Sequence, residues 1–317
     1  MGRFIGQLVR GLFICVCAGP VAAIAAGSCD DSGAEALALL EQMSRSGMAV
    51  GHQGMATLRR GGDIRVLKIH RSSDAGTVTD TLTLLTGEGS QMVQAEHSRD
   101  CTRPGHSLLR LPQGDETECG VAAYYRLSME PGERVAGRAT QRVTVRPRDM
   151  YRYGHVLELD TQTAQLLRAT TLTRDGRPLE QFQYASLVLS PGGGTDDDDS
   201  AVATYRHPAC NSGRDASGQS APASARWEPE WLPAGFVATQ DNVDGSRQTY
   251  TDGMASFSIF LEPMATDMQP GEGAIREGST IAYTRGMRLA GSQVLITVVG
   301  EVPLNTARMV ADSVALR

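Results

Sequence analysis

The stretch R-V-T-V-R-P-R-D-M-Y-R-Y-G-H-V-L-E-L-D runs from Arg142 to Asp160, near the middle of the 317-residue chain. From Tyr151 onward, apolar or aromatic residues alternate with polar or small ones. That period of two is typical of a half-buried β-strand. We interpret the stretch as two short strands joined at Pro147, with one apolar and aromatic face.

Four arginines crowd the same turn: Arg142, Arg146, Arg148 and Arg152. A guanidinium group presents a planar fork of donors that suits carboxylates and phosphates. The segment therefore combines anion-binding groups with an apolar sheet face, which favours recognition over catalysis.

The surrounding sequence predicts an antiparallel meander. Strand candidates cover residues 143–146, 151–159, 166–173 and 179–189, with an Asp175-Gly176 hairpin turn between the last two. Further candidates precede them at 54–58, 64–71, 77–85, 91–96, 107–111 and 124–128. A helix is expected at 34–43, because this segment is rich in helix formers. One face of so long a meander needs a cover, so the sheet should curl around the helix or leave an open apolar concavity.

Residues 191–226 differ sharply in composition. P-G-G-G-T-D-D-D-D-S is followed by a Ser-, Ala-, Gly- and Pro-rich stretch, which predicts a flexible acidic linker or a long excursion. The four aspartates lack the glycine and distal glutamate of a calcium loop, so we interpret them as a solvated charge run. A second domain should follow at 227–317, with strands at 247–251, 255–262, 281–287 and 293–299 and a helix at 305–315. This domain is expected to be a small α+β unit.

The N-terminus has the pattern of a secretory signal peptide over residues 1–26. Arg3 and Arg10 form a basic leader, residues 11–26 carry no charge, and the last positions are small. A lipoprotein acylated at Cys29 is the alternative, disfavoured because Ala26 stands where a larger aliphatic residue is usual. We expect export to the periplasm. Loss of the two arginines would move the formal charge from -6 to -8, and an acidic balance argues against nucleic acid as a partner.

Two cysteines flank one short segment. Cys101 and Cys119 are candidates for a disulfide that would stabilise the fold by about 3 kcal/mol. A metal site with His97 and His106 is the alternative, but its spacing matches no familiar zinc pattern. The pairing of Cys29 and Cys210 stays open.

The sequence predicts no catalytic or cofactor site. It contains no G-x-S-x-G, H-E-x-x-H or G-x-x-x-x-G-K-[ST] motif. His155 is interpreted as a satisfied strand side chain rather than a general base. These absences shift the weight from enzymes to binding proteins, and we expect neither an enzyme nor a cofactor.

Several segments resemble one known family. E-R-V-A-G-R from Glu133, R-P-R-D-M-Y-R-Y-G-H-V-L-E-L-D from Arg146, and W-E-P-E-W-L-P-A-G-F from Trp227 are similar to the MucB/RseB family of periplasmic sigma-E regulatory proteins. Y-T-D-G-M-A-S-F-S-I-F-L-E-P from Tyr250 agrees. The resemblance implies an unclosed β-barrel at 27–190 of the kind found in LolA and LolB, with a smaller C-terminal domain that binds an anti-sigma factor.

The resemblance also implies a function. Such proteins bind the periplasmic domain of a membrane-spanning anti-sigma factor (MucA/RseA-like), shield it from regulated proteolysis, and release it on sensing lipid or lipopolysaccharide. The alternative is a lipid or lipoprotein carrier that uses the same half-barrel. A homo-oligomer is left open. Candidate contacts for lipid or partner are Arg146, Arg148, Tyr151, Arg152, Tyr153, Trp231 and Phe236, each with an ordinary core or solvated-surface role as its alternative.

Overall fold

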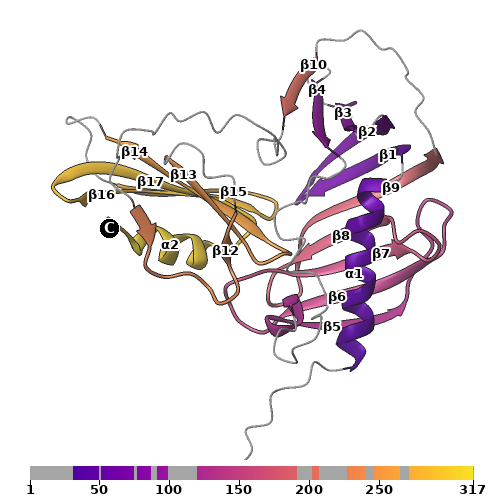
Figure 1. Cartoon of the computed structure of the whole chain (residues 1–317), viewed down its shortest axis with the longest axis horizontal. Helices are drawn as coiled ribbons and strands as arrows, with labels where there is room; N and C mark the ends of the chain where they lie inside the picture. Colours follow the sequence, from indigo (N-terminus) through magenta and orange to yellow (C-terminus); the bar gives the residue numbers. More distant parts are fainter. Residues whose placement is uncertain are drawn as a thin grey trace, which may run out of the picture.

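The computed structural model describes residues 31–49, 51–74, 77–86, 91–98, 120–190, 202–206, 227–239, 246–264 and 271–316. The predicted signal peptide, the strand candidate at 107–111 and the cysteines Cys101 and Cys119 lie outside these residues. Within them, the chain folds into two main β-sheets that lie beside each other (Figure 1).

The first sheet has ten described strands in the order β10-β4-β3-β2-β1-β9-β8-β7-β6-β5. All neighbours run antiparallel except β10 and β4, which run parallel. The end strands β5 and β10 do not pair with each other, so the sheet is open. Its strands are β1 (Gly51–Arg60), β2 (Asp63–Asp74), β3 (Thr77–Leu84), β4 (Gln91–Ser98), β5 (Tyr125–Pro131), β6 (Thr140–Pro147), β7 (Gly154–Asp160), β8 (Leu166–Leu172), β9 (Pro178–Ser190) and β10 (Val202–Arg206).

Helix α1 (Asp31–Ala49) covers one face of the β5–β8 part of this sheet. Ala36, Leu37 and Leu40 recur at helical spacing, are fully buried, and supply the helix side of the core. The sheet side comprises Leu127, Val143, Val145, Leu157 and Leu159, joined by Val121 of the short helix η2 (Gly120–Ala123) and by Tyr125. The expectation of a curled, unclosed sheet with an early helix is confirmed.

The second sheet has six described strands in the order β12-β13-β14-β17-β16-β15. These are β12 (Val237–Ala238), β13 (Arg247–Thr251), β14 (Ser256–Pro263), β15 (Glu272–Glu277), β16 (Thr280–Leu289) and β17 (Ser292–Gly300). Helix α2 (Leu304–Asp312) packs against β16 and β17 through Ala307, Val310 and Ala311. The mainly antiparallel fold with a smaller C-terminal α+β unit is thus confirmed.

Most element boundaries shift by a few residues from the sequence predictions, and three differences change the fold description. The strand predicted from Tyr151 begins at Gly154, after a bend. The predicted helix at 305–315 ends at Asp312, because Val314–Leu316 forms β18 and pairs with β11 (Trp227–Pro229). The segment 191–226, predicted as a linker or a long excursion without strands, contains β10, which extends the first sheet beyond β4.

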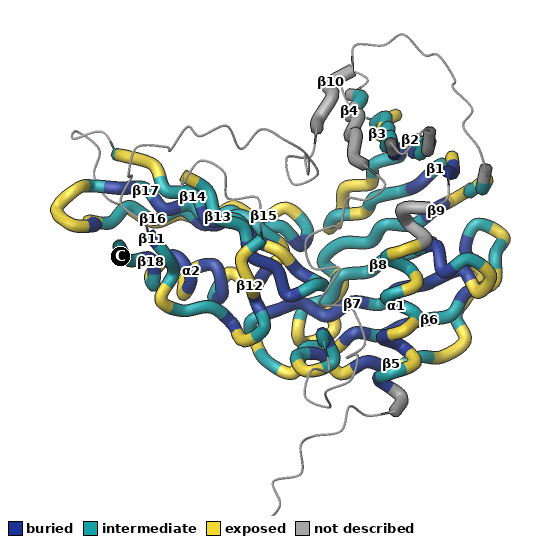
Figure 2. Tube along the Cα trace, viewed as in Figure 1, coloured by how far each residue is buried: buried dark blue, intermediate teal, exposed yellow. Residues whose placement is uncertain are grey.

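Strand β7 also contradicts the predicted polar face. Glu158 and Asp160 alternate with Leu157 and Leu159 as expected, but all four are buried, and Figure 2 shows β7 buried along most of its length.

Neither α-helix of the described part of the chain has the length and the apolar composition that a membrane span requires.

Candidate functional site

Arg152 lies at the junction between the two sheets. Its Nη1 is 2.7 Å from Oδ2 of Asp252, and both side chains are 0% exposed. Nη2 donates to the backbone carbonyl of Ala234, and Nε lies 3.2 Å from the carboxylate of Asp149. Arg152 is therefore buried, which corrects both interpretations of this residue from the sequence, an exposed contact for lipid or partner and a residue of a solvated strand face.

Aromatic rings enclose the Arg152 guanidinium. Its central carbon is 5.1 Å from the ring centroid of Tyr124, 5.4 Å from that of Tyr125 and 5.1 Å from that of Phe236, within the range of cation–π attraction. The hydroxyl of Tyr125 donates to Asp252 at 2.8 Å. Burial, together with the nearby Asp252 carboxylate, raises the pKa of Tyr125 well above its ordinary value. Tyr125 thus stays a neutral donor to Asp252.

Asp252 is fixed from its own side of the junction. Its Oδ1 accepts hydrogen bonds from the backbone N–H groups of Met254 and Ala255, at 2.9 and 2.8 Å. Because Oδ2 faces Arg152 and Tyr125, both carboxylate oxygens are satisfied. The turn after β13 therefore positions the charge that receives Arg152.

The other predicted aromatic contacts belong to the same junction. The rings of Tyr151 and Trp231 meet edge-on with centroids 5.1 Å apart, and Thr306 of α2 donates to the Tyr151 carbonyl at 2.9 Å. Phe236 is buried against Phe257, with centroids 5.1 Å apart. Tyr151, Trp231 and Phe236 therefore pack the two sheets against each other.

Tyr153 is buried just before β7. Burial raises the pKa of its hydroxyl, which has no hydrogen-bond partner among the described residues. Nothing in the described structure brings this hydroxyl to a ligand-accessible surface.

A second, more exposed contact joins the sheets. Nε of Arg60, on β1, lies 2.8 Å from Oε2 of Glu180 in the same sheet, and Nη1 of Arg60 lies 3.0 Å from Oε1 of Glu277 in the second sheet. Arg65 approaches Glu277 at 3.6 Å. The side chain of Glu277 is more than half exposed, and exposed ion pairs contribute little to stability. The buried Arg152 contact is therefore the stronger determinant of how the sheets meet.

Arg146 and Arg148 lie elsewhere, in a groove of about 840 Å³. The groove opens on the sheet face away from α1, because Arg146 and Thr144 alternate along β6 with the helix-facing Val143 and Val145. Its lining comprises Arg126, Glu130, Arg142, Thr144, Val145, Arg146, Pro147, Arg148, Gly154, Val156, Leu172, Thr173, Arg174, Asp175 and Gly176. The structure thus divides the predicted contacts between this groove and the junction.

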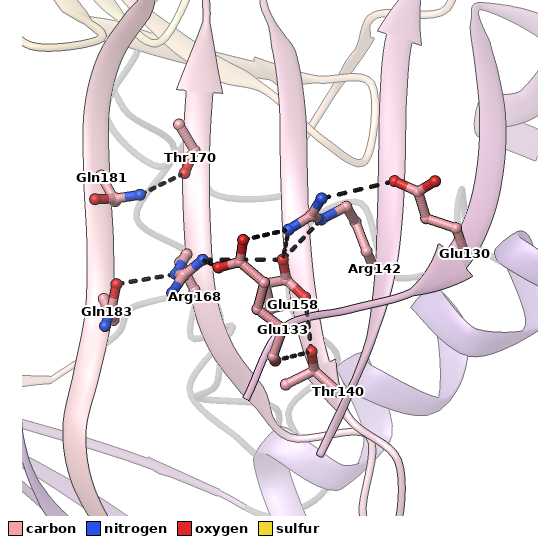
Figure 3. A network of polar contacts seen from close by, with 9 residues as sticks. All are labelled: Glu130, Glu133, Thr140, Arg142, Glu158, Arg168, Thr170, Gln181 and Gln183. Carbon is pink, nitrogen blue, oxygen red and sulfur yellow. Dashed lines mark hydrogen bonds and ion pairs between the residues drawn. The ribbon is translucent and has the colours of Figure 1, made fainter. Parts of the chain in front are cut away.

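A polar network beside the groove explains the buried charge of β7 (Figure 3). The carboxylate of Glu158 accepts from Arg142 Nε at 2.7 Å and from the Thr140 hydroxyl at 2.7 Å. Nη1 of Arg168 donates a hydrogen bond of 2.9 Å to Oε2 of Glu133. This hydrogen bond lowers the pKa of the exposed Glu133 carboxylate. The hydrogen bond that Arg142 donates to Glu158 raises the pKa of Arg142.

Gly132 makes room for this network. A Cβ at that position would lie 2.0 Å from Oε2 of Glu158 and 2.2 Å from the Thr140 hydroxyl oxygen. A residue with a side chain would displace the buried carboxylate from its donors.

Apolar side chains continue across the helix-bearing face of the first sheet, beyond α1. Leu67, Ile69, Ala56 and Tyr184 are buried there, and no described side chain of α1 belongs to this cluster. Around them, Leu58, Leu84 and Phe182 are half-buried and Leu82 is 39% exposed. Val135 and Ala136, between β5 and β6, belong to the same cluster. This part of the sheet is thus an apolar face that α1 does not cover and that is only partly exposed.

Sequence reasoning missed several residues of these sites. Asp252 and Tyr125 complete the junction, and Arg126 and Arg174 enlarge the arginine groove. Arg126 lies on a strand candidate of the sequence, residues 124–128, but its position opposite Arg146 follows only from the pairing of β5 with β6. Nothing local identifies Asp252 as the partner of Arg152, because a hundred positions separate them.

The chain matches two family models, the MucB/RseB N-terminal domain over residues 35–208 and the MucB/RseB C-terminal domain over residues 221–315. It is 30% identical over 297 residues to the sigma factor AlgU regulatory protein MucB of Pseudomonas aeruginosa, covering 89% of this chain and 91% of that protein. It is 28% identical to the sigma-E factor regulatory protein RseB of Salmonella typhimurium, covering 62% of this chain and 61% of that protein.

A solved structure of MucB in complex with MucA(peri) is similar over 89% of this chain and 99% of the MucB chain, with a TM-score of 0.66 and 29% identity. Both domain models thus match in order, and the likeness to MucB extends over most of the chain in sequence and in structure. The chain belongs to the MucB/RseB family of sigma-factor regulatory proteins, which are regulators rather than enzymes.

Proposed function

We propose that this protein acts in the periplasm, where it binds the periplasmic region of a membrane-spanning anti-sigma factor. It protects that region from regulated proteolysis and releases it when lipid or lipopolysaccharide binds. The observation that carries the proposal is the similarity, over both sheets, to MucB in complex with MucA(peri). The anti-sigma factor of this chain would be a MucA-like or RseA-like protein.

The partly exposed apolar face of the first sheet beyond α1 supports lipid binding. Leu58, Leu82, Leu84 and Phe182 offer partly exposed apolar surface next to a buried cluster, and burial of acyl chains on such a surface is favourable. Arg146 and Arg148 open on the opposite face. The acyl chains and these arginines therefore do not form one site, although the sequence combines anion-binding arginines and an apolar sheet face in one segment.

The second sheet offers an edge for the protein partner. All six residues of β15 are exposed, and Ile275 is 77% exposed. As an end strand, β15 has one row of backbone groups without a described strand partner, and an extended peptide can add to such an edge. Glu277 at the end of β15 contacts Arg60 and Arg65 of the first sheet. A peptide on β15 would thus lie next to the first sheet.

The junction around Arg152 and Asp252 would couple the two sites. A ligand shifts an equilibrium only by its differential affinity for the two states. Release on lipid binding therefore requires that lipid and anti-sigma factor favour different arrangements of the two sheets. A change in how the sheets meet must rearrange this buried junction.

The test is a pull-down of the periplasmic segment of the co-encoded anti-sigma factor by the mature protein, with and without lipopolysaccharide. We expect capture without lipopolysaccharide and release with it. Protection is measured in the same mixtures by the rate at which a site-1 type protease cleaves the segment. Absence of capture in both conditions would exclude the proposal, and lipid binding without capture would favour the carrier alternative.

Matched variants locate the two surfaces. Leu82→Glu should abolish release by lipopolysaccharide but not capture. Ile64→Glu should change neither, because Ile64 is an exposed apolar residue on the opposite face of the sheet.

Ile275→Asp should weaken capture of the anti-sigma factor segment at least tenfold. Val237→Asp serves as its control, because Val237 is 48% exposed on the other end strand of the same sheet.

A further inference from the structure

Two arginines face each other in the groove on the sheet face away from α1. Arg126 of β5 and Arg146 of β6 are directly opposite in the antiparallel register. Both are exposed, and within the described residues neither has an acidic or hydrogen-bonding partner. Like charges at directly opposed positions destabilise a pair of strands. This arrangement costs stability unless an anion lies between the two guanidinium groups.

The rest of the groove adds positive charge. The Arg148 guanidinium donates only long hydrogen bonds, from Nε to the carbonyls of Ala122 and Tyr125 at 3.3 Å. Arg174 in the β8–β9 turn also lines the groove. Arg142 is the lining arginine held by a buried carboxylate, Glu158.

The acids of the lining do not balance these arginines. Glu130 and Asp175 each contact an arginine already, Arg142 at 3.7 Å and Arg177 at 2.6 Å. Five arginines and two acids line the groove, and the buried Glu158 offsets one of these arginines, Arg142. A formal balance of +2 remains, on a chain whose overall formal charge is -6. The groove is thus a local positive site on an acidic protein.

We propose that this groove binds an extended, carboxylate-rich segment of a protein partner. Its volume of about 840 Å³ is many times that of a small anion, since one water occupies about 30 Å³. Its arginines are distributed over β5, β6 and the β8–β9 turn, as successive acidic side chains require. Guanidinium groups bind carboxylates in a bidentate manner, and Pro147, Val156 and Leu172 offer apolar contacts to the methylene groups of glutamate.

This site is separate from the surfaces of the proposed function. It opens on the face opposite the apolar residues of β1–β3 and involves no residue of β15. An experiment can therefore contradict the proposed capture of an anti-sigma factor without contradicting the binding of an acidic peptide in the groove, and the reverse also holds.

The test uses the mature protein and a fluorescein-labelled ten-residue peptide of alternating glutamate and serine. Fluorescence anisotropy should give saturable binding that weakens as salt increases, because charge contacts on an exposed surface are screened. The same peptide with glutamine at each glutamate position should not bind. The double variant Arg126→Gln/Arg146→Gln should bind at least tenfold more weakly. Arg59→Gln, at an exposed β1 arginine outside the groove, should bind as the wild type does.

Thermal unfolding provides an independent readout. The peptide should raise the Tm of the wild type but not that of the double variant. Without peptide, Arg126→Gln should raise the Tm, because it removes the opposed like charges. The proposal is overturned if the double variant binds the acidic peptide as tightly as the wild type, or if the neutral peptide binds equally well. It is also overturned if inorganic phosphate displaces the peptide at an ionic strength at which chloride does not, since the groove would then be a small-anion site.

Discussion

Arg152 and Asp252 form an ion pair between the two sheets, with 2.7 Å between Nη1 and Oδ2 and both side chains withdrawn from solvent. Burial makes such a pair costly to form, because both charges lose their hydration. It is also costly to break by removing one partner, because the other charge then stays buried alone. The pair therefore favours one arrangement of the two sheets over others.

Replacement of Asp252 by asparagine should destabilise the protein by about 3–5 kcal/mol. Asparagine retains an oxygen for the backbone N–H groups of Met254 and Ala255, so the change mainly removes the fully buried counter-charge of Arg152 and leaves the partly exposed Asp149 as its acidic neighbour. Urea denaturation measures the loss. Asp312→Asn is the control, because its pair with Arg285 is about 40% exposed on both sides and should contribute less than about 1 kcal/mol. Equal losses in the two variants would contradict a dominant role for the buried pair.

Gly235→Ala should destabilise the same junction through sterics. Gly235 has φ +89°, and a Cβ there would lie 2.3 Å from the ring of Tyr124, one of the rings around Arg152. Gly176→Ala is the matched control, since Gly176 has φ +80° with open space around it. Each variant bears the left-handed backbone cost of about 1–2 kcal/mol, and Gly235→Ala should lose at least about 1 kcal/mol more. Thermal unfolding compares the two variants. Similar decreases in Tm would show that the Tyr124 ring moves away from the added methyl group without a measurable loss of stability.

The strands were largely predictable because alternation and turn residues are local signals. Residues 247–251 were predicted as a strand and form β13 with the same bounds, and the Asp175-Gly176 turn lies between β8 and β9 as expected. The short strand β18 was not predictable, because it depends on pairing with β11 more than eighty residues away. Strand β10 was hidden by the polar composition of its neighbourhood.

The sites were less predictable than the fold. Period-two alternation assigned Arg152 and Glu158 to a solvated face, but each has a distant counter-charge that allows burial, Asp252 for Arg152 and Arg142 for Glu158. Arg146 and Arg148 were correctly placed on the surface, whereas their position on the face away from α1 follows only from the packing of the helix. Sequence patterns identify which residues can bind an anion but not which charges the fold neutralises.

Glu158→Gln should destabilise the protein by an amount between those of Asp252→Asn and Asp312→Asn. Glu158 is fully buried, but its partner Arg142 is 27% exposed, so water can partly hydrate the guanidinium left behind. We expect a loss of about 1–3 kcal/mol in urea denaturation. The order of the three variants tests whether exposure of the remaining arginine sets the cost, and a loss for Glu158→Gln as large as that for Asp252→Asn would contradict it.

His155 should make stability depend on pH in a defined window. Burial lowers the pKa of His155 from its ordinary value of 6.5 to about 4, so the folded protein keeps this ring neutral where the unfolded chain protonates it. The stability contribution is fully present above about pH 6.5, and it is lost as the pH falls toward 4. The loss from this residue should approach about 3 kcal/mol.

His155→Leu should remove this part of the pH dependence, because no ring remains to take up a proton on unfolding. The measurement is the free energy of unfolding in urea between pH 7 and 4, for the wild type and the variant. Other titrating groups act in both proteins, including Glu301, whose pKa burial raises, so the difference between the two curves isolates His155. Val143→Ala, which removes buried volume from the same core without a titrating group, should lower stability but keep the wild-type slope. If His155→Leu also keeps that slope, the folded state must accommodate a protonated His155, contrary to its burial.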